Sequence, residues 1–163
     1  MKARWLLERM QAWRDQPALA WREATCTYGE LLDAVHRWQG VMDRWGGDSL
    51  QVVALEGDYS PNACALLLAL LDRGAVAVPL SHAARAQAVV TFDPDDGWAL
   101  ERRNVDVTHE LTRRLLAAGE PGLVLFSSGS TGTSKAVLHN FRLLLDKFKV
   151  PRHRKVNLTF LLF

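Results

Sequence analysis

Two kinds of hydrophobic pattern alternate along the chain. Apolar residues at helical spacing predict helices over residues 2–14, 28–45, 61–73, 108–118 and 140–148. Short continuous apolar runs predict strands over residues 18–22, 52–55, 75–79, 89–92, 123–126, 136–139 and 156–163. Strands that alternate with helices are typical of the α/β class. We therefore expect a largely parallel sheet with flanking helices.

Polar residues mark the starts of two of these helices. Thr27, followed three residues later by Glu30, has the spacing of a capping box. Ser60 precedes Pro61, so the serine is expected to cap a helix whose first residue is the proline.

The predicted helix over residues 108–118 has weaker signals. We expect Thr108 to cap it and Gly119 to end it. Its helical spacing predicts that Leu111, Leu115 and Leu116 face inward.

Composition limits the class of protein. Apolar residues make up 48% of the 163 residues and charged residues 23%, as in folded globular proteins. A net charge of +2 gives no indication of nucleic-acid binding. The longest apolar run, residues 63–71, is too short to span a membrane, and no secretory signal is visible. Cys26 and Cys64 lie far apart in the sequence and lack metal-ligand spacing. We therefore expect both thiols to be reduced, and we expect a cytoplasmic location.

Residues 123–135 contain the most informative chemistry of the chain. An apolar strand leads into a loop of glycines and small hydroxyl residues, which Lys135 ends. Polyphosphate sites use such backbone N–H groups, hydroxyls and a lysine charge. A Walker-type loop needs Gly-Lys-Ser/Thr, but here Ser134 and Ala136 flank the lysine. A glycine–serine loop that only joins two strands and a nucleotide-binding loop both fit the pattern.

Residues 126–139, FSSGSTGTSKAVLH, resemble the phosphate-loop signature of the adenylate-forming enzymes. This superfamily includes acyl-CoA synthetases, the adenylation domains of nonribosomal peptide synthetases and luciferase-like proteins. The sequence departs from the signature at Ser134, where proline is usual, and at Ala136, where glycine is usual. Residues 27–31, 52–55 and 66–80 resemble the family's preceding helix start, strand and helix–strand block.

The resemblance implies an ATP-dependent ligase that activates a carboxylic acid. The acid and ATP would form an acyl-adenylate and pyrophosphate, with Mg²⁺ as a cofactor, and the acyl group would pass to a thiol of coenzyme A or a carrier protein. The matching positions for phosphate binding are Ser127, Ser128, Gly129, Ser130, Thr131, Gly132 and Lys135.

The resemblance also implies that residues 1–163 are the incomplete N-terminal portion of an AMP-binding adenylation domain. The family's adenine motif, ribose-binding aspartate and C-terminal domain have no counterpart in this sequence. We therefore expect this chain alone to be inactive as a ligase and to need a longer product or a second chain. The alternative is a non-catalytic remnant or binding module that keeps the phosphate loop.

Other features have a structural interpretation beside a functional one. His139 matches a common family histidine but has no nearby acid partner in the sequence. Residues 147–155 form a basic segment, either a solvated loop or an attractive surface for a partner. Asp93, Asp95 and Asp96 fit a surface turn better than a metal loop.

The early tryptophans also admit two interpretations. Six tryptophans resemble a stacking set, but four of them lie on the first two predicted helices. We therefore expect Trp5, Trp13, Trp38 and Trp45 to make core or subdomain contacts.

Overall fold

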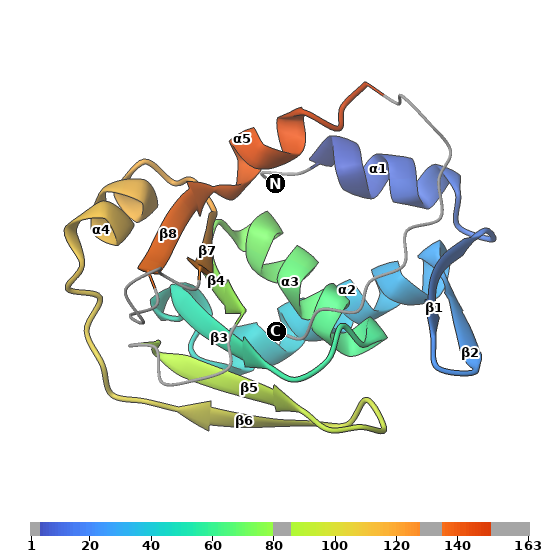
Figure 1. Ribbon diagram of the computed structural model, residues 1–163, viewed down its shortest axis with the longest axis horizontal. Coiled ribbons are helices and arrows are strands. Elements are labelled where there is room, and N and C mark those ends of the chain that lie inside the picture. The colour runs from blue at the N-terminus through green and yellow to red at the C-terminus, as the bar shows by residue number, and fades with distance from the viewer. Residues whose placement is uncertain (1–3, 80–85, 128–134, 151–163) are drawn as a thin grey trace.

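The computed structural model describes residues 4–79, 86–127 and 135–150. In these residues a six-stranded sheet has the order β6-β5-β3-β4-β7-β8 (Figure 1). The central strands β5 (Ala88–Phe92), β3 (Val52–Glu56), β4 (Val76–Pro79) and β7 (Gly122–Ser127) run parallel. The edge strands β6 (Trp98–Arg102) and β8 (Lys135–Asn140) are antiparallel to their neighbours. The predicted α/β class and largely parallel sheet are confirmed.

Helices cover both faces of this sheet. The helices are α1 (Arg4–Ala12), α2 (Tyr28–Trp45), α3 (Pro61–Arg73), α4 (Glu110–Ala117) and α5 (Phe141–Asp146), with a 3₁₀ turn at Gly47–Ser49. The period of two along each strand assigns alternate side chains to opposite faces. Val53, Leu55 and Val90 join the larger core with α2 and α3. Val52 and Ala54 face the other way, into a smaller core that Leu115 and Leu116 of α4 cover.

Local capping fixes the starts of the two central helices. The backbone N–H of Glu30 donates to Thr27 Oγ1 at 3.2 Å, and that of Thr27 donates to Glu30 Oε2 at 2.7 Å. These contacts form the predicted capping box and lower the pKa of Glu30. Ser60, which is fully buried, accepts from the N–H of Ala63 at 3.2 Å, so its predicted capping role is confirmed.

The start of α4 differs from the prediction. The helix begins at Glu110, with His109 at the N-cap position and no side-chain cap, so the assignment of Thr108 was wrong. Leu111 is 56% exposed, whereas Leu115 and Leu116 pack against the sheet as expected. The inward face of α4 is narrower than the helical spacing suggested, because Leu115 and Leu116 near its end pack against the sheet and Leu111 in its first turn does not.

Two strands were not predicted. β2 (Ala24–Thr27) pairs with β1 (Pro17–Trp21) in a separate two-stranded sheet. β6 follows the Asp93–Gly97 turn and pairs along all of β5. The predicted strand over residues 156–163 lies outside the described residues, as do residues 151–155 of the basic segment. Over the described part of the chain, the structure holds no helix with the length and apolar character that crossing a membrane requires.

Candidate functional site

β7 and β8 form an antiparallel hairpin whose two ends bracket the predicted phosphate loop. Their pairing runs from Gly122 opposite Asn140 to Ser127 opposite Lys135. Residues 128–134 lie outside the described residues, so the structure locates two of the seven predicted contacts, Ser127 and Lys135. Because these two residues are direct cross-strand partners, their Cα atoms lie about 4.5–5.5 Å apart.

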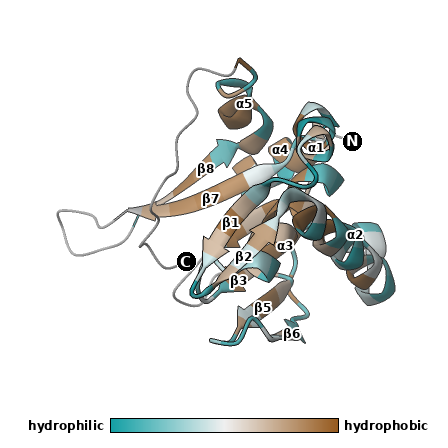
Figure 2. Ribbon diagram, turned by 90° about the vertical axis from the view of Figure 1, so that its right-hand side faces the viewer, coloured by the Kyte–Doolittle hydropathy of each residue, from teal (hydrophilic) through white to brown (hydrophobic). Residues whose placement is uncertain are grey.

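The hairpin lies at the edge of the sheet where the parallel strands end. β7 pairs with β4 at Val76–Gly122 and Ala77–Leu123, in parallel with β3, β4 and β5. The carboxyl end of β7, where the loop begins, is therefore on the same side as the carboxyl ends of these strands. Open α/β sheets bind ligands along this side. Figure 2 shows the β7–β8 hairpin extending away from the rest of the sheet, with a mostly hydrophobic β7.

The outer part of the hairpin has apolar side chains that are partly exposed. Leu123 is only 7% exposed, but Leu125, Phe126 and Val137 are 42%, 43% and 46% exposed. Leu125 is paired opposite Val137, and Phe126 points to the other face because side chains alternate. The expectation of a buried strand thus holds for the start of β7 and fails for its end. Two faces of the hairpin present apolar surface to solvent.

Lys135 and His139 lie near opposite ends of β8. The two residues share a face of the hairpin, together with Val137. Four residues of strand place their Cα atoms about 13 Å apart. His139 is half-buried opposite Leu123, at the core end of the hairpin, whereas Lys135 is exposed at the loop end. This distance supports the structural interpretation of His139.

The aspartates of the Asp93–Gly97 turn bind backbone groups. Asp93 Oδ1 accepts from the N–H groups of Asp95 and Gly97 at 2.8 and 2.9 Å. The Asp96 carboxylate accepts from the N–H of Asn62 at 3.1 and 3.2 Å, at the start of α3. These contacts confirm a turn. Among the residues that the structure describes, no group of three His, Cys, Asp or Glu side chains is placed to hold a metal ion.

Comparisons with solved structures show the fold. The Vibrio cholerae adenylation domain AlmE, in complex with glycyl-adenosine-5'-phosphate, is 17% identical with a TM-score of 0.61, over 91% of this chain and 38% of that one. The Klebsiella oxytoca NpsA N-terminal subdomain, in complexes with 3-hydroxyanthranilyl-AMSN and 3-hydroxybenzoyl-AMSN, is 23% identical with a TM-score of 0.55, over 82% of this chain and 39% of that one. The fold is that of part of an adenylation domain. This chain spans 38–39% of the length of these structures. No family model matches the sequence, and no curated protein does.

Polar contacts anchor the base of the hairpin in this partial adenylation-domain fold. Arg142 Nε donates to Glu120 Oε2 at 2.7 Å, and Asn140 Nδ2 donates to the same oxygen at 3.3 Å. Asn140 Oδ1 also accepts from the N–H of Leu143 at 3.1 Å and so caps α5. The end of β8 is therefore tied both to the turn before β7 and to the following helix.

The two cysteines of this adenylation-domain fold have the environment of structural thiols. Both are free. Burial raises the pKa of Cys64 on α3 to about 11, and it raises the pKa of Cys26 as well. Because the thiolate is the nucleophilic form, neither position favours covalent chemistry at neutral pH.

Proposed function

We propose that this chain is the nucleotide-binding part of an ATP-dependent ligase that activates a carboxylate. The observation that carries the proposal is the β7–β8 hairpin, which holds Ser127 and Lys135 opposite each other. Between them the sequence places only glycine and small hydroxyl residues. The position at the carboxyl edge of a parallel sheet is the usual ligand position in open α/β folds.

In the proposed reaction a carboxylate oxygen attacks the α-phosphorus of ATP. The bond from that phosphorus to the bridging oxygen of pyrophosphate breaks, and an acyl-adenylate forms. Charge grows on the departing pyrophosphate, so donors aimed at its oxygens lower the barrier. We assign this binding to Ser127, Ser128, Gly129, Ser130, Thr131, Gly132 and Lys135.

The chemistry of these residue types suits the β- and γ-phosphates of ATP. Glycines let backbone N–H groups approach phosphate oxygens closely, and the hydroxyls add further donors. Lys135 adds an ammonium charge from the first residue of β8. Mg²⁺ is part of the proposal through the family resemblance alone. The described residues bring no set of metal ligands together, so we assign no step to the ion.

The exposed apolar faces of the hairpin support a further part of the proposal. Leu125 and Val137 on one face and Phe126 on the other are suited to contact with more protein. The comparison structures are longer than this chain, which spans 38–39% of their length. We propose that the rest of the adenylation domain, in a longer product or a second chain, packs there. It would complete the acid site and allow transfer of the acyl group to a thiol of coenzyme A or a carrier protein.

The test is binding of MgATP to this chain, measured by calorimetry, together with carboxylate-dependent ATP–pyrophosphate exchange. We expect binding without exchange. Lys135→Ala should weaken binding about tenfold or more, since hydrogen bonds to charged groups contribute about 1.5–3 kcal/mol. Lys147→Ala, at an exposed lysine after α5, is the matched control and should bind as the parent does.

Three results would contradict parts of this proposal. Equal MgATP binding by the Lys135→Ala chain would remove the assignment of the loop. Clear exchange by the 163-residue chain alone would remove the requirement for further polypeptide. If neither an in-frame continuation nor an adjacent gene encodes the adenine motif, the non-catalytic binding module becomes the better account.

A further inference from the structure

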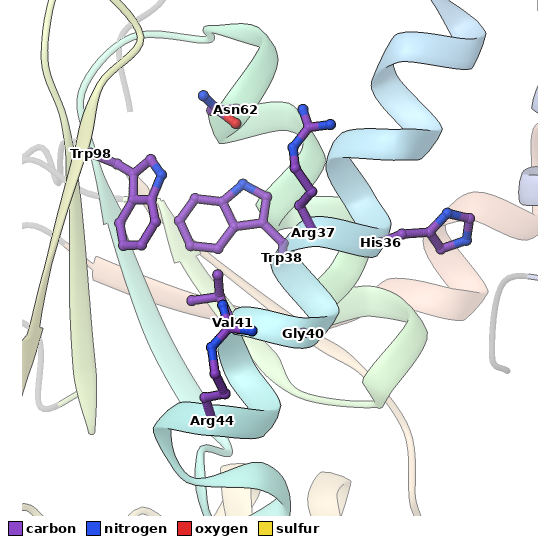
Figure 3. A pocket seen from close by; sticks show the side chains of 8 residues that line it. All are labelled: His36, Arg37, Trp38, Gly40, Val41, Arg44, Asn62 and Trp98. Atoms are coloured by element: carbon purple, nitrogen blue, oxygen red, sulfur yellow. The ribbon is translucent and has the colours of Figure 1, made fainter.

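A cavity of about 420 Å³ lies between α2, the start of α3 and β6 (Figure 3). It belongs to the opposite edge of the sheet from the β7–β8 hairpin, because β6 and β8 are the two edge strands. Five strand spacings separate these edges, which is about 24 Å. The cavity is therefore distinct from the proposed phosphate site. Its volume is within the range of small-molecule sites, roughly 300–1,000 Å³.

One wall of the cavity is aromatic. The indoles of Trp38 and Trp98 lie with ring centroids 4.6 Å apart and planes inclined by 49°. Trp38 is 2% exposed and also packs edge-on against Phe92, at a centroid distance of 6.0 Å. Trp98 is 41% exposed. Trp38 thus supports the Trp98 indole from behind, and Trp98 presents the aromatic surface that a ligand would meet.

Positive charge flanks the indoles, with one arginine of α2 on either side of Trp38 (Figure 3). Arg37 and Arg44 are two turns apart on α2, so their Cα atoms are about 10 Å apart along the axis. Within the described residues, neither arginine makes an ion pair or a hydrogen bond. Nearby arginines differ in this respect, because Arg14 pairs with Asp33 and Arg73 with Asp43. The cavity is therefore lined by two guanidinium groups that form no ion pair with the described residues.

The two ends of the cavity differ in the charges that lie near them. Asn62 lies at the α3 end, where its N–H binds the Asp96 carboxylate. Figure 3 shows the Arg37 side chain reaching toward Asn62, and Arg44 lying at the other end of the cavity. The Asp96 charge disfavours an anion at the Asn62 end and leaves the Arg44 end as the favourable position. His36 also borders the cavity, but Figure 3 shows its ring pointing away from the indoles.

We propose that this cavity binds a planar aromatic molecule that carries an anionic group. The aromatic ring lies against Trp98, and the anion, a carboxylate, sulfonate or phosphate, lies beside Arg44, with Arg37 adding positive charge from the other end of the cavity. Guanidinium groups suit both parts of such a ligand, since they bind oxyanions through a planar set of donors and stack on aromatic faces. The two arginines and the exposed indole of Trp98 would then contribute to binding of the same ligand.

The test uses the whole chain labelled with fluorotryptophan and titrated with naphthalenesulfonate. Fluorine NMR follows the Trp98 signal, which Trp98→Phe identifies by its loss. We expect a saturable shift of that signal. The double change Arg37→Ala and Arg44→Ala should weaken binding about tenfold or more. The uncharged analogue naphthalenemethanol should bind more weakly than the sulfonate by a similar factor.

Controls separate this site from general attraction of anions. Arg113→Ala removes an exposed arginine on α4, outside the cavity, and should leave binding of naphthalenesulfonate unchanged. The dispersion of the fluorine signals reports whether each variant is folded. No shift of the Trp98 signal up to the solubility limit would overturn the proposal. Equal binding by the folded double variant, or equal binding of naphthalenemethanol, would also overturn it.

Discussion

Replacing Gly122 with alanine tests how closely β7 packs where the hairpin leaves the sheet. A Cβ atom at this position would lie 2.8 Å from Val76 Cγ2, 2.9 Å from Leu115 Cδ2 and 3.1 Å from Leu138 Cδ1. Carbon atoms in good contact lie about 3.5–4.0 Å apart. These three side chains come from β4, α4 and β8, so three separate elements would have to move.

The size of the effect follows from two opposing terms. Overpacking a close-packed site costs about 1–3 kcal/mol. Gly122 is the first residue of β7, and alanine there regains up to roughly 1 kcal/mol of the conformational entropy that glycine loses on folding. We therefore expect Gly122→Ala to lower the free energy of unfolding by about 1–2 kcal/mol. The displaced β8 should also weaken MgATP binding, because Lys135 is its first residue.

The assay is urea unfolding followed by tryptophan fluorescence, with the midpoint lowered and the slope unchanged. Gly40→Ala is the matched control. Its Cβ would meet only Arg44 Nη1 at 3.8 Å, in the interior of α2. Alanine should raise the stability there by about 1 kcal/mol, since glycine is the poorer helix former.

A second variant separates steric strain from other causes. Leu115→Val shortens one of the side chains that the new methyl group meets, so the pair Gly122→Ala and Leu115→Val should show favourable coupling in a double-mutant cycle. An unchanged or raised stability of Gly122→Ala would refute the reasoning. So would a coupling of zero, because strain at Leu115 would then contribute nothing.

Three further predictions concern stability. Thr27→Ala should lower the free energy of unfolding by about 1 kcal/mol in urea titrations, through loss of the capping box. Ser60→Ala should cost about 1–2 kcal/mol in the same assay, since the Ala63 N–H loses its partner in a fully buried position. Cys64 has its pKa raised from 9.0 to about 11, so the unfolded thiol ionises first and stability should fall between pH 9 and 11. Unfolding measured across that window should show a smaller fall for Cys64→Ala, and an equal fall would contradict the assignment.

The structure agrees best with the sequence where signals are local. The caps at Thr27 and Ser60 depend on residues within one turn, so their spacing was sufficient. β2 was missed because its hairpin turn uses Arg22 at a φ of 54°, where glycine or asparagine would have marked a turn. β6 was missed although the Asp93–Gly97 turn precedes it, since its side chains are mostly exposed and give little hydrophobic signal.

One candidate site is built from consecutive residues, and the other is built from residues far apart in the sequence. The phosphate-loop motif could be recognised in the sequence because its residues are consecutive. Its flanking strands lie where the apolar runs predicted them, and the phosphate-binding role stays a prediction. The cavity joins Trp38 on α2 to Trp98 on β6, and no local pattern relates these residues. Of the early tryptophans expected in core or subdomain contacts, Trp38 is buried, whereas Trp13 and Trp45 are 39% and 37% exposed. The contact of Trp38 with Trp98 required the antiparallel pairing of β5 and β6, which brings Trp98 opposite Phe92.

The arrangement of the sheet makes the two proposals independent. The parallel strands β5, β3 and β4 lie between β6, which borders the cavity, and the β7–β8 hairpin. The edge strands β6 and β8, which carry Trp98 and Lys135, lie roughly 24 Å apart across the sheet. Effects at such a distance are usually additive within about 0.3–0.5 kcal/mol. Loss of MgATP binding in Lys135→Ala therefore gives no information about naphthalenesulfonate, and a failure of either proposal leaves the other intact.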